Sequence, residues 1–286
     1  MSLLPRLALT LALAALSVAA SSAVESDALR RRAQERQSEL EGSFTVEVET
    51  PFVVIGDEPA AVVRSRARQV VRWTVLHLKK AYFARDPDDV IEIWLFRDRA
   101  SYVRNLRERF GEAPVSPYGF YSRRHEALFM NIELGAGTLV HEIVHPFMRA
   151  NFPACPAWFN EGLASLYEQC GEESGRMVGR VNWRLPGLQE RIKQGTVLPF
   201  ERLMALSTIE FYGESEGYSI HYGQSRYLCY YLQEHGLLRR YYAEFVADAA
   251  DDPTGYRTLQ RMLGVEDMAA FQREWEAFVL RLRFPE

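Results

Sequence analysis

Two histidines four residues apart, His141 and His145, constrain the fold of this chain more than any other feature. Residues i and i+4 lie on one face of an α-helix, so a helix here points both imidazoles toward one shared atom. The 286 residues contain only six histidines, so this spacing is improbable by chance. Glu142 lies one position further round the helix, where its carboxylate could take a proton from a metal-bound water. The pattern predicts a metal-binding helix; the alternative is a pair of ordinary helical histidines.

A candidate third ligand, Glu161, follows sixteen residues after His145. Its neighbours Gly162 and Ala164 are small enough for a second helix to approach the first closely. Two histidines and one carboxylate form the ligand set of a catalytic zinc site, which keeps a fourth position open. The sequence therefore predicts one Zn²⁺ per chain, held by His141, His145 and Glu161. The alternative third ligands are Glu168 and Glu133.

These motifs together resemble the gluzincin metallopeptidases, in particular the peptidase-MA-like family of bacterial exported proteins. In that family a His-Glu-x-x-His helix is followed by Trp-x-x-Glu-Gly-x-Ala, as in residues 158–164, and later by Tyr-x-Gln-Ser, as in residues 222–225. The resemblance covers roughly residues 128–236. It implies a zincin-like fold with an active-site cleft, and hydrolysis of peptide bonds in a peptide or protein substrate.

The resemblance also implies roles for individual residues. Glu142 is expected to be the general base on the metal-bound water and to pass the proton to the leaving amine. In gluzincins a downstream tyrosine or histidine stabilises the oxyanion, and Tyr222 matches the motif tyrosine. His221 and Tyr218 remain alternatives, as does a simple packing role for Tyr222. Asn160 is a candidate for orienting one of the metal ligands.

A different function remains open: a non-catalytic, zinc-containing peptide-binding or scaffold protein of the same fold. Glu142 argues against it, because a structural zinc site does not need this carboxylate and usually closes all four positions. A third possibility is a membrane-associated processing factor anchored by its export segment. The sequence has no obvious motif for clamping a free amino terminus, which favours an endopeptidase. No pattern indicates the oligomeric state.

Residues 1–23 have the pattern of an export signal, with Arg6 before an apolar run over residues 7–18 and small residues at the expected cleavage site. The run is too short for a comfortable membrane span, which needs about 20 residues. We therefore expect an exported protein, periplasmic or secreted, without a stable span after cleavage; an uncleaved anchor is the alternative. The formal net charge of −4 gives no indication of nucleic-acid binding.

Three cysteines occur in the chain. Cys155 and Cys170 bracket the segment that carries Glu161, so a disulfide between them would brace the third ligand. Two buried thiols are an equally good interpretation. Cys229 stands among tyrosines and leucine, which is typical of a core residue.

The hydrophobic pattern predicts an α+β fold, with a small mixed α/β layer and its β-sheet followed by a mainly helical C-terminal half. Residues 24–43 are expected to form a charged linker or solvated helix, and residues 44–286 a single unit. Within it we expect an α/β subdomain at 44–134 and a zinc-binding helical subdomain at 135–286, with the cleft between them. The predicted elements of the first part are strands at 44–55, at 90–96 and twice within 119–132, and helices at 59–86 and 98–110.

The predicted second part begins with the zinc helix and the helix that carries Glu161. Further helices are predicted at 180–195, 199–206, 222–232, 237–247 and 271–282, with a glycine-rich loop at 211–219. The strand at 127–132 leads almost directly into the zinc helix, and it is either internal or an edge that could pair with an extended substrate, as the resemblance implies. Pro146 removes a helical N–H directly after His145, so we expect the zinc helix to kink or loosen there.

Overall fold

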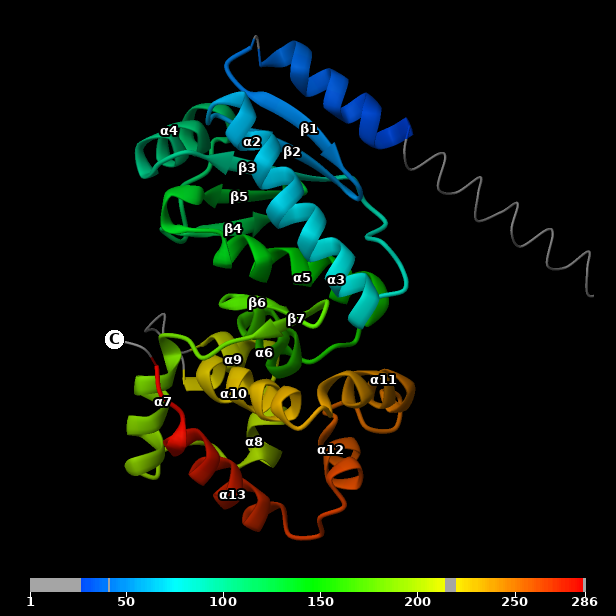
Figure 1. Cartoon of the computed structure of the whole chain (residues 1–286), viewed down its shortest axis with the longest axis vertical. Coiled ribbons are helices and arrows are strands. Elements are labelled where there is room, and N and C mark those ends of the chain that lie inside the picture. The colour runs from blue at the N-terminus through cyan, green and yellow to red at the C-terminus, as the bar shows by residue number, and fades with distance from the viewer. Residues whose placement is uncertain (1–26, 41, 214–219, 285–286) are drawn as a thin grey trace, which may run out of the picture. The chain divides into compact units, whose positions relative to one another are not determined.

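The structure is a computed structural model of the chain that describes residues 27–40, 42–213 and 220–284 (Figure 1). The predicted export signal lies outside the described residues. Among the helices that the structure describes, none has the length and apolarity that a bilayer crossing requires. The chain divides into two compact units. The N-terminal unit ends at Arg72 and resumes over Asp89–Leu134, and the C-terminal unit comprises Trp73–Asp88 and Gly135–Glu286.

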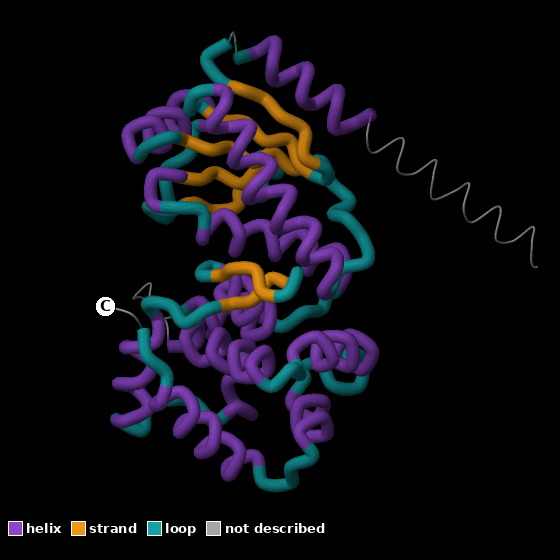
Figure 2. The backbone as a smooth tube through the Cα atoms, in the orientation of Figure 1, coloured by secondary structure: helices purple, strands orange, loops and turns teal. Residues whose placement is uncertain are grey.

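A mixed five-stranded sheet forms the centre of the N-terminal unit (Figure 2). Its strands are β1 (Thr45–Glu49), β2 (Phe52–Gly56), β3 (Ile91–Phe96), β4 (Gly119–Ser122) and β5 (Ala127–Asn131). They follow the order β1-β2-β3-β5-β4, in which β2, β3 and β5 are parallel and each outer strand is antiparallel to its neighbour. The three central strands are buried along their whole length, as parallel strands usually are.

β5, the strand that precedes the predicted metal-binding helix, is internal to this sheet. It pairs with β3 on one side and with β4 on the other. The edge on that side therefore belongs to β4, and of the two alternatives for residues 127–132 the structure has the internal strand. The apolar run at 127–130 fits the internal position, because all five residues of β5 are buried.

The helical segments of the N-terminal unit include one, α4 (Arg99–Phe110), that the sequence located well. α4 begins after Asp98, whose side chain accepts from the Ser101 N–H, and ends at Gly111 in the left-handed conformation. This is the predicted helix at 98–110, and an aspartate cap and a left-handed glycine are typical of its two ends. The other helical segments are residues 27–39, α2 (Ala60–Arg66), the π-helical η1 (Ala67–Arg72) and the 3-10 turn η2 (Ile132–Leu134).

The helix at residues 27–39 is the helical alternative expected within 24–43; most of its side chains are exposed, and one face packs against the sheet. Leu29 is fully buried in the same core cluster as Trp94. Arg32 Nη1 and Arg36 Nε lie 3.1 Å and 2.7 Å from Oε1 of Glu92, a buried residue of β3. A buried carboxylate needs charged partners, and these two arginines supply them.

Two predicted elements have different boundaries in the structure. The single strand expected at 44–55 is a hairpin, in which Thr50 and Pro51 form the turn between β1 and β2. The long helix expected to reach residue 86 ends with α3 (Trp73–Ala81). Beyond it, the Asn151 side chain bonds to both the N–H and the carbonyl of Arg85, at 2.9 Å and 2.8 Å. These bonds hold the backbone of Arg85 in a non-helical conformation.

The C-terminal unit is mainly helical, as predicted. Besides α3, its helices are α5 (Gly137–Asn151), α6 (Ala157–Tyr167), α7 (Arg184–Lys193), α8 (Phe200–Met204), α9 (Thr208–Tyr212), α10 (Ile220–Glu234), α11 (Leu238–Asp248), α12 (Tyr256–Leu263) and α13 (Met268–Arg281). The sequence analysis missed α12 and the hairpin of β6 (Cys170–Glu173) and β7 (Arg176–Gly179). Ser174 and Gly175 form its turn with φ of 50° and 70°, as a two-residue hairpin turn requires.

Gly162 lets α6 approach α10 closely, whereas the expected partner at this glycine was the helix of His141 and His145, α5. A Cβ at this position would lie 2.9 Å from the Ser225 carbonyl oxygen and 3.0 Å from Cys229 Sγ, both on α10. α6 is also anchored by the buried Trp158, whose indole N–H donates to the Thr254 carbonyl at 2.9 Å. The small residue and the aromatic anchor therefore fix the helix that carries Glu161.

Gly162→Ala is expected to destabilise the protein by about 1–3 kcal/mol, because the added methyl group meets backbone that cannot yield freely. Gly187→Ala is the matched control, since no heavy atom lies within 4 Å of a Cβ there. It lies inside α7 and should leave the stability unchanged or raise it by up to about 1 kcal/mol. Urea unfolding of both variants measures the difference. Equal stability of the two variants would contradict the close approach of α6 and α10.

Candidate metal centre

α5 presents His141 and His145 on one face, and their ring centroids are 4.9 Å apart. The helix is continuous from Gly137 to Asn151 with Pro146 inside it. Proline leaves the Glu142 carbonyl without its intrahelical donor. The expected loosening nevertheless does not interrupt the helix or separate the two imidazoles.

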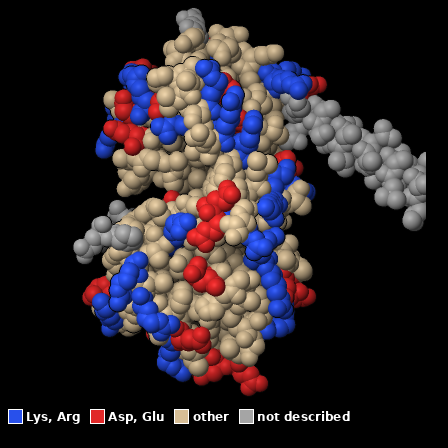
Figure 3. Space-filling view, in the orientation of Figure 1, with Lys and Arg blue, Asp and Glu red and all other residues tan. Residues whose placement is uncertain are grey.

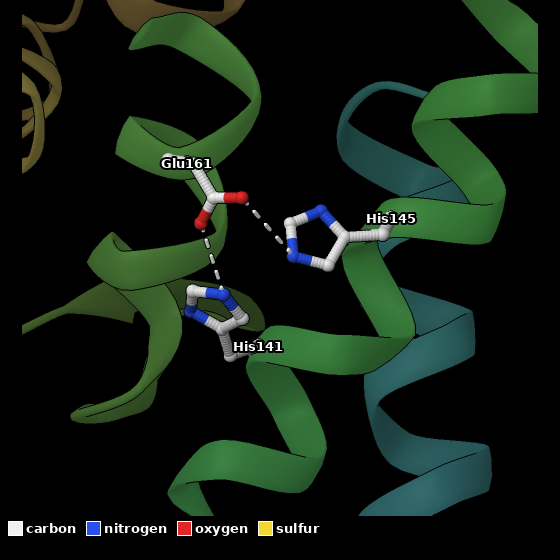
Figure 4. Close-up of side chains that lie close together, drawn as sticks. All are labelled: His141, His145 and Glu161. Carbon is white, nitrogen blue, oxygen red and sulfur yellow. Dashed lines mark ion pairs between the residues drawn. The ribbon is translucent and has the colours of Figure 1, made fainter. Parts of the chain in front are cut away.

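α6 brings the Glu161 carboxylate to both rings (Figure 4). Glu161 Oε2 lies 3.2 Å from His141 Nε2, and Glu161 Oε1 lies 3.8 Å from His145 Nε2. One ligand atom from each of the three residues lies within 4.8 Å of the other two. The residues that the sequence singled out thus form a cluster that could hold a metal ion.

The chemistry of the cluster suits a cation. Glu161 Oε2 is buried and faces His141 Nε2 at 3.2 Å, and a buried carboxylate oxygen needs such a positive partner. Burial alone would raise the pKa of Glu161, but the charges of His145 and His141 lower it to about 2. Burial alone would lower the pKa of His141, but hydrogen bonding to Glu161 and Glu168 raises it to about 10. Positive charge is therefore favoured beside these carboxylates, and two imidazoles with a carboxylate are typical zinc ligands.

The outer nitrogen of each imidazole faces a polar partner, so that the inner nitrogen faces Glu161. Glu168 Oε1 lies 3.0 Å from His141 Nδ1, and Asn160 Oδ1 lies 3.0 Å from His145 Nδ1. Arg184 holds Glu168 in turn, with Nη2 donating to Oε1 at 2.8 Å. Partners of this kind fix the ring orientation of metal-binding histidines. Asn160 therefore makes the expected contact with a histidine, His145, and Glu168 contacts the outer nitrogen of His141.

Glu133, the other alternative ligand, lies in the N-terminal unit. Its Oε2 accepts a hydrogen bond from the Arg99 backbone N–H at 3.2 Å. It is not one of the three clustered residues. Among the described residues, neither Glu168 nor Glu133 therefore replaces Glu161 in the cluster.

Tyr212 is the contact residue that the sequence analysis missed. Its hydroxyl donates to Glu161 Oε1 at 2.5 Å. Sequence analysis assigned it to a loop at 211–219, but it is the last residue of α9, and residues 214–219 lie outside the described residues. The signal was present in the capping box of Ser207 and Glu210, which begins this short helix.

The three candidates for the oxyanion donor differ in their surroundings. Tyr222, on α10, packs beside Tyr212 with ring centroids 6.2 Å apart. Burial and then the charge of Glu161 raise its pKa well above the usual range, so it remains a protonated donor. His221 is buried, with Nδ1 3.1 Å from the Phe211 carbonyl oxygen. Tyr218 lies outside the described residues.

All three cysteines are free in the structure. Cys155 precedes α6 and Cys170 follows it, and a helix of this length separates its ends by about 16 Å. That distance is far beyond the reach of a disulfide. Of the two interpretations of Cys155 and Cys170, the structure therefore has the free thiols. Cys229 is fully buried, as expected of a core residue.

Comparison with known proteins adds no assignment. No protein-family model matches the chain, and a search of curated proteins gives no match either. The function must therefore be argued from the motifs and from the geometry of the cluster.

Tyr212→Phe is expected to weaken zinc binding by about tenfold, the lower end of the range for residues that contact a metal ligand. The substitution removes the hydroxyl that donates to Glu161 and keeps the ring, so the packing of α9 is preserved. Competition with a fluorescent zinc chelator measures the affinity. An unchanged affinity would show that Glu161 does not depend on this hydrogen bond for its position.

Proposed function

We propose that this protein is a zinc-dependent peptide-bond hydrolase, a metallopeptidase of the gluzincin type with a zincin-like fold. The observation that supports it most directly is the convergence of His141, His145 and Glu161, with Glu142 on the same helix as the two histidines. Endopeptidase activity on an exported peptide or protein is the preferred form, at a periplasmic or secreted location.

His141, His145 and Glu161 are the residues that would hold zinc, which when bound polarises a substrate carbonyl and makes water more acidic. Glu142 is half-buried, and among the described residues no hydrogen bond or ion pair engages its carboxylate. An unengaged carboxylate is what a general base requires. Glu142 accepts the proton of the attacking water and delivers it to the nitrogen of the leaving amine.

Tyr222 is the proposed donor to the oxyanion. Burial, and then the charge of Glu161, raise its pKa and keep the hydroxyl protonated. Its ring packs beside Tyr212, whose hydroxyl donates to Glu161. Arg184 lies 5.3 Å from the centroid of this ring and also binds Glu168. The same arginine therefore contacts both the donor tyrosine and the partner of His141.

Tyr222→Phe is expected to lower kcat by about 10²–10³-fold with little change in zinc affinity, because the hydroxyl acts only on the charge that develops during reaction. Steady-state peptide hydrolysis and zinc titration separate the two effects. The comparison with Tyr212→Phe is informative, since that variant should mainly lose affinity. A kcat that stays at the wild-type level would exclude Tyr222 as the donor.

Incubating the purified protein with a peptide library tests the proposal as a whole. Internal peptide bonds should be cut, cutting should stop with a chelator, and added Zn²⁺ should restore it, with about one zinc per chain by elemental analysis. Chelator-sensitive peptide binding without any cleavage would instead support the non-catalytic binding protein. Mass spectrometry of the products distinguishes internal cleavage from trimming at the ends.

A further inference from the structure

A cavity lies in the C-terminal unit, and none of the residues of the metal cluster line it. Residues of α3, α6 and β7 line it, together with the α10–α11 connection, and its volume is about 160 Å³. Tyr82 and Tyr167 lie at one wall, and Met177, Val178 and Leu238 give it an apolar surface. A cavity of this size suits a compact ligand, well below the 300–1,000 Å³ typical of drug-sized ones.

The charged lining is almost entirely basic. Lys80, Arg176 and Arg239 line the cavity, and no Asp or Glu does. Lys80 Nζ bonds to the Gly175 carbonyl at 2.8 Å, and Arg239 bonds to the carbonyls of Lys80 and Ala81, both at 3.3 Å. Figure 3 shows basic side chains gathered from the end of α3 toward α11.

None of these three basic side chains has an anionic partner among the described residues. Carbonyl oxygens are neutral, and among the described residues no carboxylate pairs with Lys80, Arg176 or Arg239. His77, which also lines the cavity, faces Glu172, with Nε2 3.4 Å from Oε2. The rim therefore presents positive charge that the described residues do not compensate.

A tyrosine pair adds a hydrogen-bond donor. The hydroxyls of Tyr82 and Tyr167 lie 2.7 Å apart and share one hydrogen bond. Two hydroxyls carry two protons, so one O–H remains without an acceptor among the described residues. Burial raises the pKa of both tyrosines above the usual range, which keeps both protonated. An acceptor from a ligand would satisfy this proton.

We propose that this cavity binds a compact organic anion. Its carboxylate or phosphate head faces Lys80, Arg176, Arg239 and the spare tyrosine hydroxyl, and its apolar body packs on Met177, Val178 and Leu238. The site is distinct from the metal cluster and does not depend on the proposed hydrolase activity.

Calorimetry of the full chain with three probes tests the chemistry. 3-Phenylpropionate and phenyl phosphate carry the two candidate head groups, and 3-phenylpropionamide is the neutral control. Binding of either anion at least tenfold tighter than the amide supports the site, and the tighter anion identifies the head group. Equal binding of the amide, or no binding of either anion, overturns it. The titrations are repeated with EDTA, because binding that EDTA abolishes would lie at the metal cluster and would also overturn it.

Charge variants locate the probe. Arg176→Met and Arg239→Met should each weaken anion binding about three- to tenfold, while Lys193→Met, an equal charge change on the exposed surface of α7, should not. Thermal melting verifies that each variant is folded. Tyr167→Phe removes a hydroxyl without changing charge and should also weaken binding. Equal weakening by Lys193→Met, or none by either arginine variant, would overturn the assignment to this cavity.

Discussion

Glu142→Gln is expected to bind zinc as the wild type does and to hydrolyse peptides about 10²–10⁴-fold more slowly, the range that general-base catalysis supplies. The carboxamide has nearly the same shape as the carboxylate but cannot accept the proton of the attacking water. Because Glu142 makes no hydrogen bond or ion pair with described residues, its replacement should leave the arrangement of His141, His145 and Glu161 unchanged.

The measurement is a single-turnover assay on a peptide that the wild type cleaves, with zinc content determined on the same samples. Glu266→Gln makes the same chemical change at an exposed position between α12 and α13 and should retain full activity. Activity near the wild-type level in Glu142→Gln would remove this residue as the base. Loss of zinc together with activity would instead show that Glu142 supports the metal.

Local sequence signals predicted the parts of the fold that depend on a few neighbouring residues. The spacing of His141 and His145 requires a helix, and Asp98 with Gly111 marks both ends of α4. These features are set within one or two turns of helix, so the sequence alone was sufficient.

Features that depend on distant partners were not predictable in the same way. The helix at 27–39 is ordered by Glu92, more than fifty residues away, and the end of α3 by the side chain of Asn151. Tyr212 reaches Glu161 across 51 positions in the sequence. A polar side chain that completes a distant site leaves no periodic pattern, and only the folded chain identifies its partner.

The orienting contacts favour a catalytic over a purely structural metal. Each histidine offers the cluster one nitrogen while the other faces Glu168 or Asn160. Only three protein ligands converge among the described residues, whereas structural zinc sites have four. Three converging ligands and a free carboxylate at Glu142 are what our proposed hydrolysis requires. A non-catalytic zinc-containing scaffold protein would not need the carboxylate.

Removing one ligand should abolish both stoichiometric zinc and the stability that zinc provides. We expect His145→Ala to retain no zinc after dialysis, because two remaining ligands bind the ion weakly. A ligand present at 1,000 times its Kd stabilises the folded state by about 4 kcal/mol. For a chain of this size that corresponds to a rise in Tm of roughly 10 °C. EDTA should therefore lower the Tm of the wild type by about this amount.

EDTA should leave the Tm of His145→Ala unchanged, since this variant has no zinc to lose. His235→Ala is the control: this exposed histidine at the end of α10 bonds only to the Tyr231 carbonyl, at 2.8 Å, among its described hydrogen bonds. It should respond to EDTA as the wild type does. Differential scanning calorimetry with and without EDTA, paired with elemental analysis, measures both effects. If EDTA shifts none of the three proteins and the wild type contains no metal, the cluster is an ion-pair network, and the hydrolase proposal fails with it.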